Sequence, residues 1–61
     1  MTIRISNLET VKQGTRTELV RVEYIAHSID DCKDGVDAMA YELASEHMNT
    51  VTLGQVIATP E

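Results

Sequence analysis

The chain has to build its core almost without aromatic side chains, because it contains no Phe, no Trp and only two Tyr among 61 residues. Aromatic side chains bury the most surface per residue, so the core depends on Ile, Val, Leu and Met. A chain this short forms one domain, residues 1–61, whose stability is marginal. Small cores often gain stability from a partner chain, so we expect a homodimer or a tight complex as the alternative to a monomer.

In the first half of the chain, apolar and polar residues alternate as in the strands of a β-hairpin. Ile3 and Ile5 are separated by polar residues, which is the period of a half-buried strand. Residues 12–17 are polar, contain a glycine and predict the turn. Residues 18–27 are the clearest strand, and their two faces differ. One face is mainly apolar, whereas the other carries charges together with Leu19 and Ile25, so both faces of the sheet are expected to make contacts.

Residues 28–48, SIDDCKDGVDAMAYELASEHM, have the pattern of one amphipathic helix. Ser28 stands where an N-cap would, and Asp31 three residues later resembles a capping box. Gly35 would then lie inside the helix, at a cost of about 1 kcal/mol relative to Ala. Apolar residues step by three and four along one face, which we expect to cover the sheet: Ile29, Cys32, Val36, Met39 and Leu43.

A third strand is predicted over residues 50–58, with a bend at Gly54 and an end at Pro60. It can pair antiparallel with the first strand, so that the first strand lies in the middle of the sheet. The expected fold class is α+β. It is a small two-layer β-β-α-β sandwich, with a three-stranded, mainly antiparallel sheet and one amphipathic helix across one face.

Charge is distributed unevenly along the chain, whose net charge is −5. Residues 1–27 hold four basic and three acidic side chains, whereas residues 28–61 hold one basic and seven acidic ones. The acidic second half favours a basic protein partner. It argues against direct nucleic-acid binding, because that affinity comes mainly from cations that neutralise phosphates.

The sequence favours a protein that is not an enzyme. Cys32 lies on the apolar stripe as a small hydrophobic residue, and His27 and His47 have no companion at metal-ligand spacing. Phosphate loops and serine elbows are missing, so we expect no catalytic residues, no cofactor and no metal. The start of the chain has no signal-peptide pattern and no segment resembles a membrane span, so we expect a cytoplasmic protein without membrane contact.

The predicted helix turns an acidic face outward. At about 100° per residue, its aspartates fall opposite the apolar stripe, together with an aromatic and a thioether side chain that suit an interface. A charge run of this kind is also the ordinary composition of a solvated face. The predicted partner-binding residues are Asp30, Asp31, Asp34, Asp37, Ala38, Tyr41, Glu42 and Met48.

Two functions are compatible with these features. In size, charge and α+β economy the chain is similar to small acidic proteins of phages and mobile elements that block restriction enzymes, CRISPR effectors or RNA polymerase. That resemblance implies a viral, anti-defence inhibitor that acts as a DNA mimic, its acidic helix occluding a basic surface of a nucleic-acid-handling partner. The alternative is a structural or assembly module that homo-oligomerises through its sheet, using Leu19 and Ile25.

Overall fold

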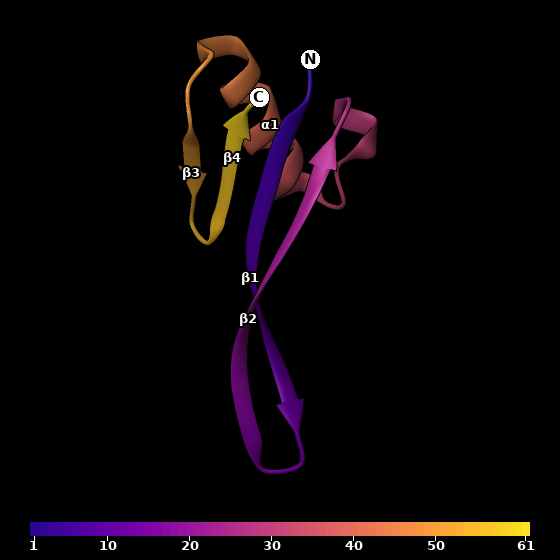
Figure 1. Ribbon diagram of the computed structural model, residues 1–61, viewed down its shortest axis with the longest axis vertical. Coiled ribbons are helices and arrows are strands. Elements are labelled where there is room, and N and C mark those ends of the chain that lie inside the picture. Colours follow the sequence, from indigo (N-terminus) through magenta and orange to yellow (C-terminus); the bar gives the residue numbers. More distant parts are fainter.

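A computed structural model describes all 61 residues and shows a four-stranded antiparallel sheet with one helix packed on one face (Figure 1). The elements follow one another in the order β-β-α-β-β, and the strands lie in the spatial order β2-β1-β4-β3. The α+β class, the single helix and the central position of the first strand are confirmed. The number of strands differs from the prediction.

The strands β1 (Ile3–Gln13) and β2 (Arg16–Ala26) form a hairpin of two 11-residue strands. Gly14, with φ 63°, takes the first position of a two-residue turn, where glycine meets the positive φ at no steric cost. Figure 1 shows the far half of this hairpin projecting as a twisted arm beyond the helix and the other strands. The molecule is therefore elongated, with extents of 42 × 18 × 18 Å.

The helix is shorter than predicted. Helix α1 spans Gly35–His47, and the residues before it form a 3₁₀ turn, η1 (Ile29–Asp31), followed by Cys32 in an extended conformation. The capping signal at Ser28 is outcompeted by a second one six residues later. The Asp34 carboxylate accepts a hydrogen bond from the Asp37 N–H at 2.9 Å and caps α1. Beginning there places Gly35 at the first helical position instead of the interior.

The predicted strand 50–58 is in fact a second hairpin, β3 (Val51–Leu53) and β4 (Val56–Pro60). Gly54, with φ 58°, begins the two-residue turn between them rather than bending one strand. β4 pairs antiparallel with β1, as expected for the last strand, and β3 adds a short edge beyond it.

The face of the helix that meets the sheet was predicted wrongly. The stripe expected to cover the sheet leaves Val36 and Met39 exposed. The buried helix residues are instead Asp37, Ala40, Tyr41 and Ala44. Two alanines at this contact bring the helix close to the sheet, and the polar ends of Asp37 and Tyr41 find hydrogen-bond partners there. The remaining core consists of Ile3, Ile5, Ala26, Val56 and Ala58.

Candidate interaction surface

A buried polar contact joins the start of α1 to β2. Asp37 is only 1% exposed, and the Tyr24 hydroxyl donates to its Oδ2 at 2.6 Å. Asp37 lies in the first turn of the helix, where the helix dipole favours a negative charge. Its other carboxylate oxygen, Oδ1, is buried without a hydrogen-bond partner. This contact fixes the rotation of α1 on the sheet, and it removes Asp37 from the surface.

The environment of this contact also raises the pKa of two side chains. Burial, together with the hydrogen bond to Asp37, raises the pKa of Tyr24, so its hydroxyl stays protonated as a donor. Burial and the nearby carboxylates, Asp37 first among them, raise the pKa of the Cys32 thiol. A thiol whose pKa is raised is less ionised at neutral pH, and the thiolate is the nucleophilic form.

Tyr41 makes the second polar contact beneath the helix. It is 8% exposed, and its hydroxyl donates to the His27 carbonyl at 3.3 Å, with the Met1 carbonyl at 3.5 Å. Its expected outward placement is therefore wrong, as it is for Asp37. Both side chains hold the helix to the sheet, and neither is available to a partner of this chain.

The other predicted partner-binding residues are divided between two elements. Asp30 and Asp31 lie in η1, and Asp31 accepts a hydrogen bond from the His27 N–H at 3.0 Å. Glu42 is exposed on α1, whereas Ala38 is half-buried. The two remaining positions flank α1 at its ends and are exposed: Asp34 and Met48. The extended segment at Cys32 separates the two groups, so a continuous acidic row along one helix does not form.

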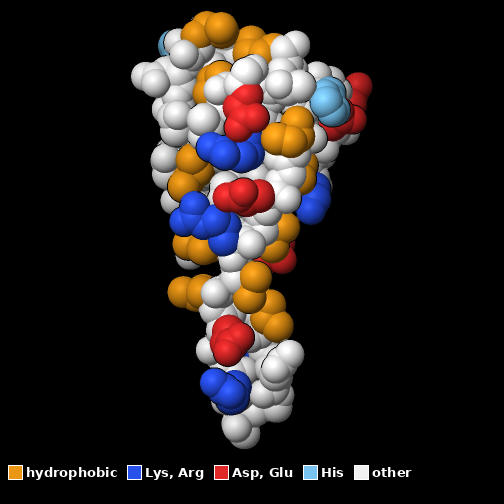
Figure 2. Space-filling model, viewed as in Figure 1, with side chains coloured by type: hydrophobic (Ala, Val, Ile, Leu, Met, Phe, Trp, Pro, Cys, Tyr) orange, Lys and Arg blue, Asp and Glu red, His pale blue; other side chains and the backbone are white.

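The face of the sheet that α1 leaves uncovered mixes charged and apolar side chains. Residues opposite each other in the antiparallel pairs share a face, and Ile3 and Ile5 point to the helix side. The uncovered face therefore carries Arg4, Ser6, Leu8 and Thr10 of β1 opposite Ile25, Glu23, Arg21 and Leu19 of β2. Figure 2 shows this face, with acidic and basic side chains alternating along its middle and hydrophobic ones beside them. Leu19 is 68% exposed and Ile25 is 43% exposed.

The projecting arm carries apolar side chains on both faces. Val11 and Val20 lie on the helix side of the ribbon, beyond the reach of α1, and both are exposed. Leu19 lies on the opposite side. An isolated two-stranded hairpin is marginally stable in water, and the arm leaves these three apolar side chains exposed.

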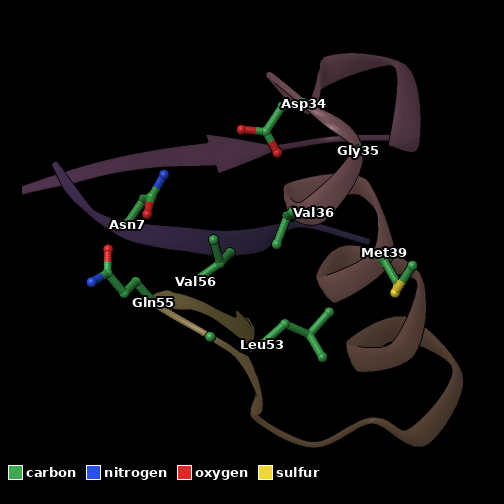
Figure 3. Close-up of a pocket in the computed structure, with 9 residues that line it drawn as sticks. Asn7, Asp34, Gly35, Val36, Met39, Leu53, Gln55 and Val56 are labelled. Atoms are coloured by element: carbon green, nitrogen blue, oxygen red, sulfur yellow. The ribbon is translucent and has the colours of Figure 1, made fainter.

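An open groove of about 760 Å³ lies between the beginning of α1 and the β3–β4 turn. In Figure 3, Val36 and Val56 face each other across it, Leu53 approaches from the sheet, and Asn7 and Gln55 lie on the side away from Met39. The groove contains no charged side chain except Asp34, which is engaged as the helix cap. It is a second apolar surface, separate from the uncovered face of the sheet.

The hairpin extends further than the sequence predicts. Residues 12–17 were predicted as a six-residue turn, but they continue the strands up to a two-residue turn, which lengthens the arm. The signal for this was present, since a glycine in the first turn position needs only one further residue to close a hairpin. Leu19 and Ile25 were correctly placed on the face opposite the main apolar side of β2.

The structure shows no group of three or more His, Cys, Asp or Glu side chains positioned to hold a metal ion. The 13 residues of α1 are too few and too polar for this helix to cross a membrane. Comparisons with protein-family models, curated proteins and solved structures found no match to this chain.

Proposed function

We propose that this protein is a non-enzymatic assembly module that associates with a second copy of itself through its sheet. The observation that supports this most is the state of β2. No backbone group on its outer edge is hydrogen-bonded within the chain, and it carries the two most exposed apolar residues of the uncovered face, Leu19 and Ile25. An edge strand of this length is a template for pairing with another chain.

The small size of the core supports the same proposal. Only ten of the 61 residues are buried, and four of the eight apolar ones among them are alanines. Full burial of a large aliphatic side chain contributes about 1.5–3 kcal/mol, whereas alanine contributes much less. A chain that leaves Leu19 and Ile25 in water while burying so little gains stability from covering them with a partner.

Molecular mass measured by light scattering over a dilution series tests the proposal. The expected result is a dimer that dissociates on dilution, and Ile25→Glu should shift the equilibrium to monomer. The matched control is Met39→Glu, because Met39 is similarly exposed, at 56%, but lies on the helix. That variant should remain dimeric. A wild-type monomer at every concentration would refute the proposal.

A second candidate function is binding of a basic protein partner, in the manner of a phage-type inhibitor. It is favoured by exposed carboxylates that have no ion-pair partner, since the salt bridges involve only Arg4 with Glu61 and Arg16 with Glu18. The exposed carboxylates of the middle of the chain belong to Asp30, Asp31, Asp34, Glu42 and Glu46. With Asp37 buried, this acidic surface consists of the η1 turn and the outer side of α1.

Charge reversal on the outer side of the helix tests this second candidate. Glu42 and Glu46 are exposed and take part in no salt bridge or side-chain hydrogen bond, so Glu42→Lys with Glu46→Lys should leave the fold intact. In affinity capture from a host lysate, a specific basic partner should be lost both in high salt and with this variant. Retention of that partner by the variant would contradict the acidic-surface mechanism.

A further inference from the structure

We infer that β2 of one copy pairs antiparallel with β2 of a second copy, with Val22 on the two-fold axis. The inference rests on the proposed self-association and specifies its surface and register. It joins the two sheets into one of eight strands, in which the two β2 strands are central. Strand β3, at the other edge, has only three residues and offers a much shorter template.

The backbone on the outer edge of β2 makes no hydrogen bond within the chain. Of 33 backbone hydrogen bonds, 29 lie within helices and strands of the chain, and none of the other four involves residues 16–26. No side chain bonds to the backbone of these residues either. The strand contains no proline, and it pairs with β1 without a bulge, so two of the devices that block an edge are missing, whereas a third, charged side chains, is present.

Symmetry restricts the registers that are possible. Two antiparallel strands related by a two-fold axis keep the same face upward, and directly opposite residues point to the same face. A residue of β2 must therefore stand opposite one that lies an even number of positions away, so the axis passes through a residue. The candidates in the middle of β2 are Val20, Arg21, Val22 and Glu23.

The register centred on Val22 places side chains of opposite charge across from each other. It places Arg21 of each copy opposite Glu23 of the other, which gives two pairs of opposite charge on the uncovered face. Within one chain neither side chain takes part in a salt bridge. Opposite charges across a strand pair are favourable, whereas like charges directly opposite are unfavourable.

The same register also matches the apolar side chains. Leu19 stands opposite Ile25 on the uncovered face, and Val20 stands opposite Tyr24 on the helix face. Val22 meets its own copy. Pairs of aliphatic residues, or of an aliphatic with an aromatic one, stabilise a strand pair by about 0.2–1 kcal/mol each. The two most exposed apolar residues of this face are thereby covered by each other.

The neighbouring registers pair the charged side chains less favourably. Centring on Arg21 or on Glu23 places a charged residue opposite its own copy, which is a like-charge pair. Centring on Val20 places Arg21 opposite Leu19 and leaves all four charges of the strand without a partner of opposite sign. Only the Val22 register pairs every charged and apolar side chain between residues 19 and 25.

The arm of each copy then runs along the body of the other. Arg16 reaches the level of residue 28 in the second copy, where the acidic segment 28–34 begins. The tip of the arm, residues 12–17, has two basic and no acidic side chains, whereas residues 28–34 have three acidic and one basic. The arrangement therefore brings a positive tip beside a negative segment twice, which agrees with the uneven charge of the chain.

Complementary charge reversals test the register. Arg21→Glu alone creates two Glu–Glu pairs, and Glu23→Arg alone creates two Arg–Arg pairs, so each variant should dimerise about tenfold or more weakly than the wild type. An equimolar mixture of the two variants restores opposite charges in both pairs. Sedimentation should therefore show a heterodimer in the mixture and monomers in each separate sample. Wild-type affinity in both single variants, or no gain on mixing, would overturn the register.

A disulfide cross-link provides an independent readout, in a Cys32→Ser background that removes the native thiol. Val22→Cys should cross-link two copies on oxidation, because opposite Cα atoms in a strand pair lie about 4.5–5.5 Å apart, within disulfide range. Val20→Cys is the matched control, since its two copies would be about 13 Å apart along the strands. Equal cross-linking of the two variants would overturn the inference.

Different results would overturn the register and the self-association. A dimer that survives Arg21→Glu and dissociates with Met39→Glu would place the interface in the groove beside α1 and overturn both the register and the association through the sheet. A dimer that dissociates with Ile25→Glu but does not cross-link through Val22→Cys would overturn the register alone. A monomer at every concentration would overturn the self-association on which the register depends.

Discussion

Tyr24 and Asp37 carry more of the architecture than their polarity suggests. The 2.6 Å hydrogen bond between them is the one side-chain to side-chain hydrogen bond of the molecule, and it joins the sheet to the first turn of α1. Lys33 adds to it, because its backbone N–H donates to the Tyr24 hydroxyl at 3.2 Å and its Nζ lies 4.6 Å from the centroid of the ring. A single tyrosine thus connects β2, the loop and the helix.

Removal of the Tyr24 hydroxyl should destabilise the protein. Tyr24→Phe leaves the buried Asp37 carboxylate without its donor, which costs about 1–3 kcal/mol in the free energy of unfolding. Urea denaturation at neutral pH measures this loss. A variant as stable as the wild type would show that the contact contributes nothing to stability.

The same tyrosine predicts a dependence on alkaline pH. Burial raises the pKa of Tyr24 in the folded state, so the folded protein holds this proton more tightly than the unfolded chain does. The resulting stabilisation is fully present below about pH 10, the unfolded pKa, and it is lost as the pH rises above that value. The wild type should lose stability more steeply than Tyr24→Phe between about pH 9 and 11. Parallel pH profiles of the two proteins would contradict this assignment.

At the scale of elements, two similar capping signals compete for the beginning of α1. Ser28 with Asp31 and Asp34 with Asp37 have the same spacing, and local sequence alone does not rank them. The second signal prevails because it places Gly35 at the first position of the helix and lets Asp37 reach Tyr24 on the sheet. That tertiary contact also rotates the helix, which is why the apolar stripe was a poor guide to the buried face.

Alanine substitutions distinguish the two caps. Asp34→Ala removes the hydrogen bond to the Asp37 N–H and should cost about 0.5–2 kcal/mol in the free energy of unfolding. Ser28 makes no side-chain capping bond, so Ser28→Ala should change the stability by no more than a few tenths of a kcal/mol. Equal losses of stability in the two variants, measured by urea denaturation, would contradict the assignment of Asp34 as the N-cap of α1.

Two glycines should respond oppositely to alanine. A Cβ at Gly35 meets no atom within 4 Å and the backbone there is not left-handed, so Gly35→Ala should stabilise the protein by about 0.4–1 kcal/mol. Gly54 has φ 58°, and alanine in that left-handed conformation costs about 1–2 kcal/mol. Thermal denaturation of both variants checks the signs, and stabilisation by Gly54→Ala would contradict the turn.

The hairpin strands were predictable where apolar and polar residues alternate regularly. Alternation identified the start of β1 at Ile3 and most of β2, and polarity located the turn that contains Gly14. The second hairpin was missed because Gly54 was interpreted as a bend within one strand. Gly54 followed by Gln55 has the same two-residue turn pattern as Gly14 followed by Thr15, and β3 pairs with β4 across it. The outward placement of Asp37 and Tyr41 failed because their hydrogen-bond partners are distant in sequence.

At the scale of the whole molecule, the chain is more extended than a compact domain of its length. The radius of gyration is 12.5 Å, whereas a compact chain of this length would have about 10.5 Å. The excess comes from the arm seen in Figure 1, which no other element of the chain supports. Pairing of β2 with a second copy would place each arm beside the partner's body and convert a lone ribbon into part of a wide sheet.

If folding is coupled to association, thermal stability should depend on protein concentration. If the folded state is dimeric, an increase of about a hundredfold in protein concentration should raise Tm by roughly 5–10 °C. The Tm of Arg21→Glu should change much less, because that variant places like charges opposite each other. A wild-type Tm that is independent of concentration would indicate a protein that folds and functions as a monomer.

Hydrogen exchange across residues 19–25 tests the pairing of β2 most directly, because it reports on each backbone amide. In a single chain only the amides that point toward β1 are hydrogen-bonded, which is about every second one. At concentrations that favour the dimer, the outward amides should also become protected, and dilution should expose them again. Outward amides that exchange rapidly at every concentration would contradict the account.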